Sequence, residues 1–354
     1  MNSKMMLLGG LAAAALMTAP VMAADSWYPL KVNATKVSGE KGEFDYTPLT
    51  EKASKNWSIC VSVPHMKDPF FVAMNYGIIE EAKLLGVDVQ TLDAGGYDKL
   101  ANQVTQVENC VAGGANAVVL VAISEDGMGN LMAELNEKNI PVIAAINPVN
   151  AETAARVLTN PHDEALRLGQ FLAAEHPAGS DPVKVGWLPG PKGAGFVTAF
   201  ETGFKAGIEG SAVEITETKN GDVGKEVQAA LVEDMLQAHP DLNYLAGTAV
   251  MVEAALPLLK SKDMLGKVKP VSIYTTPGVY EALKAGEIEA AGWAPVVLTS
   301  RIVLDTAVRV LENKLEYTDV DAMGKVFTPA TAGELDPLSV LSPAGYAPVF
   351  SLDQ

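Results

Sequence analysis

Short apolar runs alternate with helical stripes along most of the chain after Trp57. The first run is followed by apolar residues at helical spacing from Phe71 to Leu85. Asp68 and Pro69 mark the start of this helix, because Asp caps a helix N-terminus and Pro fits its first turn. Alternating strands and helices with short connections predict a parallel sheet, and the chain is long enough for two domains.

The pattern predicts two successive sets of strands and helices. In the first set we expect strands at 87–92, 117–122 and 141–146, with helices at 97–111 and 126–138. A helix ending at 175 leads to the second set, with strands at 183–188, 213–218, 244–247, 271–274 and 288–293 and helices at 197–207, 223–238, 250–259, 279–285 and 298–311. The fold class is therefore α/β with two Rossmann-like lobes, whose facing carboxyl ends form a ligand cleft.

The amino terminus predicts export. Lys4 is the only charged residue before Asp25, an apolar run covers 5–17, and Val21-Met22-Ala23 suits a signal peptidase. We therefore expect residues 1–23 to be a signal peptide, cleaved near Ala23, and the protein to be exported. The alternative is a retained anchor, but the run is short for a membrane span, and no later stretch predicts membrane insertion.

Composition and motifs exclude several classes of protein. The formal net charge is −17 and the lysines and arginines are scattered, which argues against a nucleic-acid partner. The sequence has no HExxH, CxxC or Gly-x-Ser-x-Gly motif, and its four histidines lie on separate predicted elements. We therefore expect no cofactor, no metal and no catalytic residues, and hence a protein that is not an enzyme.

The chain has two cysteines, Cys60 in the first predicted strand and Cys110 near the end of the second predicted helix. Export to an oxidising compartment permits a disulfide between them. The alternative is a pair of buried free thiols, because sequence alone does not fix the distance between Cα atoms.

Four aromatic residues follow strands at different cleft positions, although only 6% of the chain is aromatic. These are Phe70, Phe71, Tyr274 and Trp293. Each ring alone is as well explained by ordinary core packing, but the set predicts a ring-lined pocket. Ring faces attract positive charge by roughly 0.5 to 2 kcal/mol each, which suits a small cationic or methylated ligand better than a free sugar.

Polar side chains at the same loops can bond to an oxygen on such a ligand. The candidates are the imidazole of His65, the amide of Asn147 and the phenol of Tyr274. The predicted ligand-binding set is therefore His65, Asp68, Phe70, Phe71, Asn147, Tyr274 and Trp293.

Several strings together carry a family resemblance: PHMKDPFFVAMNYG, LDAGGYDK, CVAGGANAVVL, GTAVMVEAA and SIYTTPGVYEAL. From Trp57 onward the chain resembles the type I periplasmic binding proteins, and within them the periplasmic sensors of trimethylamine-N-oxide reductase systems. The resemblance implies three crossovers between lobes, near Asn160, Pro295 and Gly324. It places 57–160 with 296–323 in an N-terminal lobe and 161–295 with 324–354 in a C-terminal lobe, and leaves 24–56 as an extension that packs as an arm against a lobe or a partner.

The resemblance also implies a function. Such sensors bind trimethylamine N-oxide without catalysis and associate with the periplasmic sensor domain of a hybrid histidine kinase, which controls a phosphorelay. Relatives carry tryptophans early in the first helix after the lobe crossing, whereas this chain has Asp163-Glu164-Ala165-Leu166-Arg167. This departure leaves open a related amine oxide, sulfoxide or betaine. The competing hypothesis is the substrate-binding subunit of an ABC importer for a small polar ligand.

Overall fold

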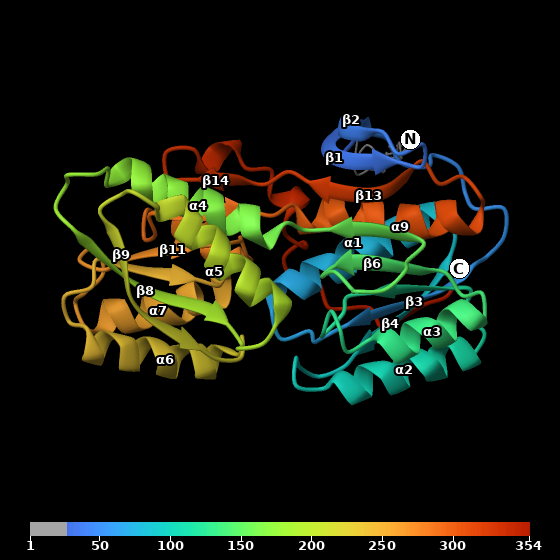
Figure 1. Cartoon of the computed structure of the whole chain (residues 1–354), viewed down its shortest axis with the longest axis horizontal. Coiled ribbons are helices and arrows are strands. Elements are labelled where there is room, and N and C mark those ends of the chain that lie inside the picture. Colours follow the sequence, from blue (N-terminus) through green and yellow to red (C-terminus); the bar gives the residue numbers. More distant parts are fainter. Residues whose placement is uncertain (1–26) are drawn as a thin grey trace, which may run out of the picture.

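The computed structural model describes residues 27–354, so the predicted signal peptide, 1–23, lies outside the described residues. Two α/β lobes lie side by side, each built on its own sheet (Figure 1). The predicted fold class is therefore confirmed.

The N-terminal lobe has a nine-stranded sheet with the strand order β15-β4-β3-β5-β6-β7-β13-β1-β2. Its strands are β1 (Leu30–Lys36), β2 (Lys41–Tyr46), β3 (Ser58–Val63), β4 (Asp88–Asp93), β5 (Ala117–Leu120), β6 (Val142–Ile146), β7 (Ala155–Leu158), β13 (Tyr317–Ala322) and β15 (Ser351–Leu352). Its helices are α1 (Pro69–Leu85), α2 (Leu100–Ala112), α3 (Gly129–Glu137) and α9 (Val296–Leu311). The helices α1 and α9 cover one face of the sheet, and α2 and α3 cover the other (Figure 1).

The C-terminal lobe has a six-stranded sheet with the order β14-β12-β11-β10-β8-β9. Its strands are β8 (Val183–Gly190), β9 (Val213–Asn220), β10 (Tyr244–Gly247), β11 (Lys269–Ser272), β12 (Ala290–Trp293) and β14 (Lys325–Phe327). Its helices are α4 (Pro161–Glu175), α5 (Gly195–Ile208), α6 (Lys225–Ala238), α7 (Ala249–Ser261) and α8 (Pro277–Lys284). All strands pair in parallel except β14, which is antiparallel to β12.

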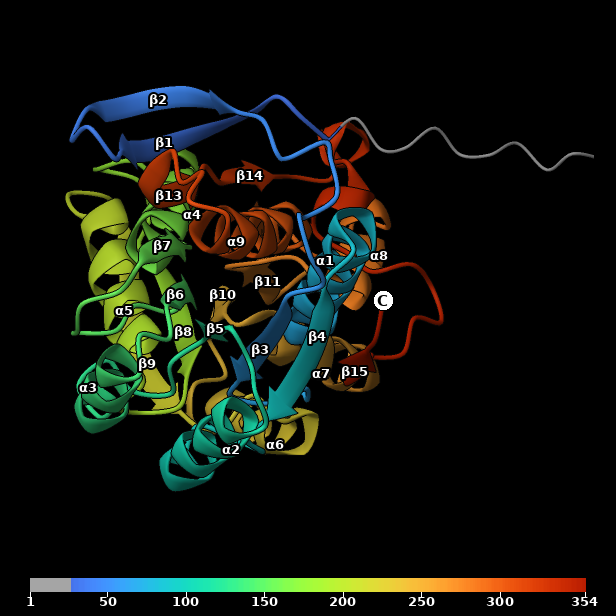
Figure 2. The ribbon, with the colours of Figure 1, turned by 90° about the vertical axis from the view of Figure 1, so that its right-hand side faces the viewer.

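The described part of the predicted arm, 27–56, is a built-in part of the N-terminal lobe. The hairpin β1–β2 joins the sheet through antiparallel pairing of β1 with β13, and Figure 2 shows it beside β13 above α9. The Tyr46 hydroxyl donates to Asp305 in α9 at 2.5 Å, and the Leu49 backbone N–H donates to the same carboxylate at 2.7 Å. The hairpin thus extends the sheet and is anchored to the helix beneath it.

The placement of the whole segment 324–354 in the C-terminal lobe is wrong at its end. After β14, the chain returns to the N-terminal lobe, where β15 pairs with β4. The Asn75 side chain in α1 fixes this return, because its amide donates to the Val349 carbonyl at 2.9 Å and its oxygen accepts from the Val349 N–H at 2.8 Å. The chain therefore crosses between the lobes once more than the three predicted crossovers.

Cys60 in β3 and Cys110 in α2 form a disulfide, with 6.4 Å between their Cα atoms. The predicted bridge is confirmed, and it fastens α2 to β3 of the N-terminal sheet. Among residues 27–354, no helix is both long and apolar enough to cross a membrane.

Candidate functional site

A cavity of about 60 Å³ lies between the two lobes at the carboxyl ends of their strands. One water needs about 10–15 Å³ on the same measure, so the cavity has room for about four to six non-hydrogen atoms. Its described lining is His65, Asp68, Phe70, Phe71, Tyr97, Ile146, Asn147, Thr159, Pro161, Glu164, Phe196, Phe200, Val223 and Tyr274. Six of the seven predicted binding residues are therefore brought together, and their role in binding stays a prediction.

Asp68 links the lobes across this cavity. Its carboxylate caps α1 by accepting the Phe70 N–H at 2.9 Å and also accepts the Tyr274 hydroxyl of the C-terminal lobe at 2.5 Å. Burial raises the pKa of Asp68 to about 6, although both hydrogen bonds act to lower it. Burial also raises the pKa of Tyr274 well above its usual value, so its hydroxyl keeps its proton and serves as the donor.

Aromatic rings from both lobes form the cavity walls. Phe70 lies edge-on to Phe71 and to Tyr274, with ring centroids 5.4 and 5.5 Å apart. On another side, Tyr97 of the N-terminal lobe meets Phe196 of the C-terminal lobe at 5.3 Å. The Phe70–Tyr274 pair and the Tyr97–Phe196 pair each join rings from opposite lobes, so closure of the lobes completes the wall.

His65 is a fully buried polar side chain of this wall whose ring nitrogens have no hydrogen-bond partner among the described residues. It lies edge-on to Phe71 at 5.0 Å and to Tyr97 at 5.4 Å. Burial lowers its pKa to about 4, so the ring is neutral at pH 7. A neutral imidazole carries one N–H donor and one acceptor nitrogen, and both are available to a ligand here.

Asn147 is held at the end of β6 by a strained turn. Its backbone N–H donates to the Ala145 carbonyl at 2.6 Å, which places Ile146 at the centre of a γ-turn with φ of 60°. A β-branched residue rarely adopts this conformation, which costs on the order of 1–3 kcal/mol. The Asn147 amide donates to the Ala122 carbonyl at 3.0 Å and to the Tyr97 hydroxyl at 3.3 Å, so the turn fixes one ring of the wall.

Glu164 supplies a carboxyl group to the cavity from the first turn of α4. The Asn160 side chain caps this helix by accepting the Asp163 N–H at 3.1 Å. Burial and, after it, the negative charge of Asp321 together raise the pKa of Glu164 to about 8, while Arg167 acts to lower it. The sequence marks this stretch as a departure from relatives, but it does not show that Glu164 faces the ligand site.

Trp293 is the one residue of the predicted ligand-binding set that does not line this cavity. It is the last residue of β12, and its indole N–H donates to the Ser339 hydroxyl at 2.8 Å. Its ring is thereby tied to the segment that follows β14.

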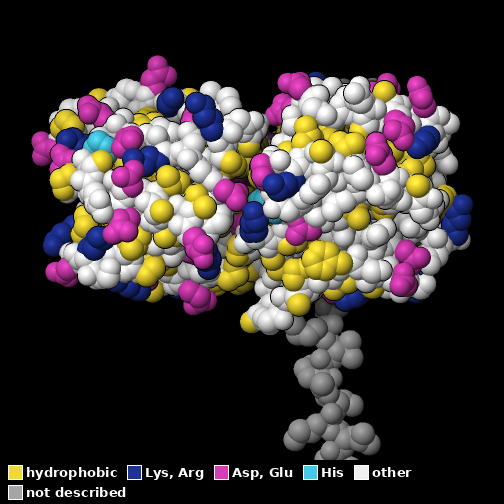
Figure 3. All heavy atoms as spheres, turned by 90° about the horizontal axis from the view of Figure 1, so that it is seen from below, with side chains coloured by type: hydrophobic (Ala, Val, Ile, Leu, Met, Phe, Trp, Pro, Cys, Tyr) yellow, Lys and Arg dark blue, Asp and Glu magenta, His cyan; other side chains and the backbone are white. Residues whose placement is uncertain are grey.

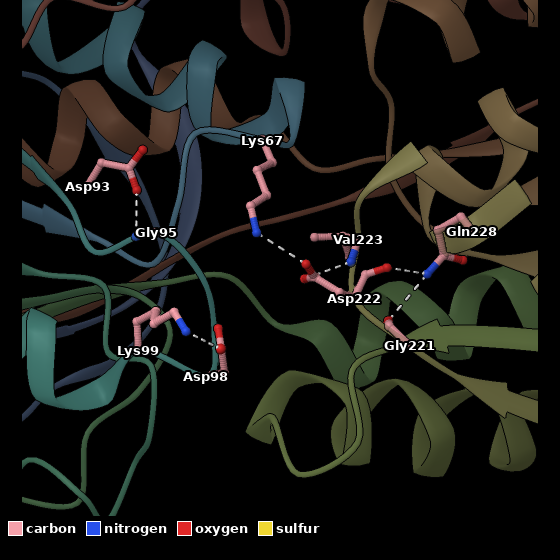
Figure 4. Close-up of polar contacts among 9 residues, drawn as sticks. All are labelled: Lys67, Asp93, Gly95, Asp98, Lys99, Gly221, Asp222, Val223 and Gln228. Atoms are coloured by element: carbon pink, nitrogen blue, oxygen red, sulfur yellow. Dashed lines mark hydrogen bonds and ion pairs between the residues drawn. The ribbon is translucent and has the colours of Figure 1, made fainter. Parts of the chain in front are cut away.

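A polar contact closes the mouth of the cleft. Lys67 donates to the Asp222 carboxylate of the opposite lobe at 3.2 Å (Figure 4). The Val223 N–H binds the same carboxylate at 2.9 Å, and Gln228 donates to the backbone carbonyls of Asp222 and Gly221 at 2.8 and 3.3 Å. Asp222 is thus held in place to meet Lys67.

The space-filling view from below shows the groove between the lobes, bordered by acidic and basic side chains (Figure 3). A hollow of about 650 Å³ adjoins the cavity here, since Tyr97 lines both, and Lys67 and Asp222 lie on its walls. The polar rim therefore leads to an apolar interior.

The sequence profile of the periplasmic binding protein domain matches residues 59–315. The chain belongs to this family. It is 32% identical to the periplasmic protein TorT of Escherichia coli (strain K12) over 305 residues, which is 86% of both chains. Its fold is also that of a solute-binding protein of an ABC transporter from Bradyrhizobium sp. BTAi1 with bound BIS-TRIS, at 43% identity, 92% coverage of this chain, 99% of that chain and a TM-score of 0.80.

A second solved structure relates this periplasmic binding protein to a signalling complex. The TorS sensor domain–TorT complex in the presence of TMAO matches at 29% identity and a TM-score of 0.76, covering 83% of this chain and 100% of that chain.

The cavity residues of this periplasmic binding protein that sequence reasoning missed include Tyr97, Glu164, Phe196 and Phe200. Tyr97 and Phe196 each come soon after a strand, Tyr97 in the string LDAGGYDK and Phe196 after a glycine-rich turn. The rule that identified Phe70 would therefore also have identified both rings. Among residues 27–354, no group of His, Cys, Asp and Glu side chains is placed to hold a metal ion.

Proposed function

We propose that this periplasmic binding protein is exported to the periplasm, binds trimethylamine N-oxide, and reports it to the periplasmic sensor domain of a hybrid histidine kinase. The observation that carries the proposal is the unpartnered imidazole of His65 inside a small ring-lined cavity. The protein acts by binding, without catalysis or a cofactor.

The size and chemistry of the cavity match this ligand. Trimethylamine N-oxide has one nitrogen, one oxygen and three methyl carbons, which agrees with room for about four to six non-hydrogen atoms. Its methyl groups carry partial positive charge and suit the faces of Phe70, Phe71 and Tyr274. Its oxygen is a strong acceptor and would accept a hydrogen bond from the N–H of His65, which has no protein partner.

The relatives support the signalling part of the proposal. TorT, whose complex with the TorS sensor domain was solved in the presence of TMAO, is 32% identical to this chain over most of its length. A ligand that contacts both lobes favours the closed arrangement. Its higher affinity for the closed than for the open state shifts the population of the two states, and this shift is the signal to the kinase.

Calorimetry with two variants tests the ligand. We expect His65→Phe, which keeps a ring but removes the donor, to weaken trimethylamine N-oxide binding by about tenfold, the loss of one buried hydrogen bond. The matched control is His176→Phe, because His176 lies in the other lobe and bonds to Tyr244 at 2.8 Å, outside the cavity. Absence of heat with the wild-type protein would refute the ligand assignment.

A second function is favoured by one comparison, the 43% identity to a solute-binding protein of an ABC transporter. In that case the protein delivers a small polar amine to a permease. Bound BIS-TRIS in that relative is a tertiary amine, so both functions agree on the ligand class. Size-exclusion chromatography with a TorS-type periplasmic sensor domain separates them, because a sensor forms a complex with it and an importer subunit does not.

A further inference from the structure

The carboxyl group of Glu164 stands in the cavity wall without a partner. Within residues 27–354 it accepts no hydrogen bond and forms no ion pair, although Arg167 lies one helical turn away. It shares the cavity with His65, which is fully buried and whose two ring nitrogens have no hydrogen-bond partner. The imidazole and the carboxyl group thus leave two polar side chains of one small ring-lined space open to a ligand.

We propose that small alkylammonium cations are a further ligand class of this site and that Glu164 is the residue that selects them. The proposal rests on the proposed function, because it uses the same ring-lined cavity. It adds a charged class of ligand to the neutral N-oxide.

The charges around the cavity favour a cation. Among the described residues, no lysine or arginine lines it, whereas Asp68 and Glu164 do, and rings fill most of the remaining wall. An ammonium head would therefore meet ring faces and one carboxylate without a basic neighbour. The Asp68 carboxylate already accepts hydrogen bonds from the Phe70 N–H and the Tyr274 hydroxyl, so Glu164 is the carboxylate that remains for the ligand.

The proposal couples cation binding to pH. Asp321 on β13 and Asp163 on α4 raise the pKa of Glu164 together with burial, Arg167 lowers it, and the result is about 8, while Asp68 across the cavity titrates near 6. A cation binds the ionised form of Glu164, so binding near pH 7 releases a proton. The apparent affinity for a cation then rises about tenfold per pH unit up to pH 8, and the affinity for the N-oxide does not.

Calorimetry on the mature chain, with tetramethylammonium chloride and trimethylamine N-oxide as probes, tests this. We expect Glu164→Gln to weaken tetramethylammonium binding at least tenfold and to change N-oxide binding less than threefold. Glu175→Gln, at the exposed far end of α4, removes the same charge from the same helix and should change neither. The binding heat of the cation should differ between phosphate and HEPES buffers, which indicates proton release. The binding heat of the N-oxide should not show this difference.

Each other outcome has a definite meaning. Tetramethylammonium bound equally by wild type and Glu164→Gln overturns the role of Glu164. Binding of the N-oxide alone by the wild-type protein overturns this inference and leaves the proposed function standing, whereas binding of neither probe overturns both. Should Glu164→Gln not fold, the wild-type pH series decides, because an affinity for the cation that is constant from pH 6 to 8 contradicts the proposal.

Discussion

Replacing Tyr274 by Phe removes one hydroxyl and keeps the ring, and so isolates the hydrogen bond that joins the lobes through Asp68. At pH 7 the Asp68 carboxyl is mostly ionised, because its pKa is about 6. A hydrogen bond to a charged group contributes about 1.5–3 kcal/mol. The other polar contact across the cleft, Lys67 with Asp222, is 47% and 39% exposed, and such pairs contribute at most about 1 kcal/mol.

We therefore expect Tyr274→Phe to shift the equilibrium between open and closed lobes by about 2 kcal/mol, or roughly 30-fold, toward the open form. Because the ligand binds the closed form, its apparent dissociation constant should rise by up to that factor. The measurements are calorimetry with trimethylamine N-oxide and the radius of gyration from small-angle X-ray scattering.

The control for this experiment is Tyr280→Phe on α8, which loses a hydroxyl of the same lobe outside the cavity. Unchanged affinity and unchanged scattering for Tyr274→Phe would show that the bond to Asp68 does not govern closure. A large fall in melting temperature would instead show that Tyr274 serves the core of its lobe.

Three further predictions concern other parts of the molecule. Replacing Cys60 and Cys110 by Ala should lower the free energy of unfolding in urea by about 4 kcal/mol, since the bridge spans a sequence separation of 50; equal denaturation midpoints with and without the bridge would contradict this. Trp293→Phe loses the bond to Ser339, so calorimetric scans should show a melting temperature lower by about 2–4 °C and titrations an affinity within twofold of wild type. Burial raises the pKa of Asp68 from the usual 3.8 to about 6, so its stabilising contribution is complete below pH 4 and is lost as pH rises through 6. The wild-type protein should thus lose about 2–3 kcal/mol of unfolding free energy relative to Asp68→Asn between pH 4 and pH 7, and parallel pH profiles would refute the assignment.

The fold was predictable wherever an element carries its own pattern. The strand predicted at 244–247 is β10 with the same bounds, and the helix predicted after Asp68 is α1, because a buried run and a cap are local signals. The strands β2 and β15 gave no such signal. They are mostly exposed edge strands, and β15 pairs with β4, which is far from it in the sequence. Their pairing depends on contacts that a local pattern does not contain.

The site was predictable to the level of loops but not of side-chain direction. Phe70 and His65 were found because they follow the first strand, and loops at carboxyl ends of strands line the cleft in this fold. Trp293 satisfies the same rule, yet its indole turns to Ser339. Glu164 lies on a helix, where its place in the wall depends on how α4 is rotated against the other lobe. That rotation is set by packing, which the sequence does not state.

The unpartnered imidazole of His65 also explains how closure depends on a ligand. The Asp68–Tyr274 bond and the ring pairs favour closed lobes with or without a ligand, and alone they would hold the protein shut. Burying the two nitrogens of His65 without partners opposes them by about 1–3 kcal/mol. A ligand oxygen that accepts from the His65 N–H removes the part of this penalty that belongs to the donor nitrogen, and does so only in the closed form. The resulting difference in affinity, about 5- to 150-fold, is the size of coupling that signalling proteins use.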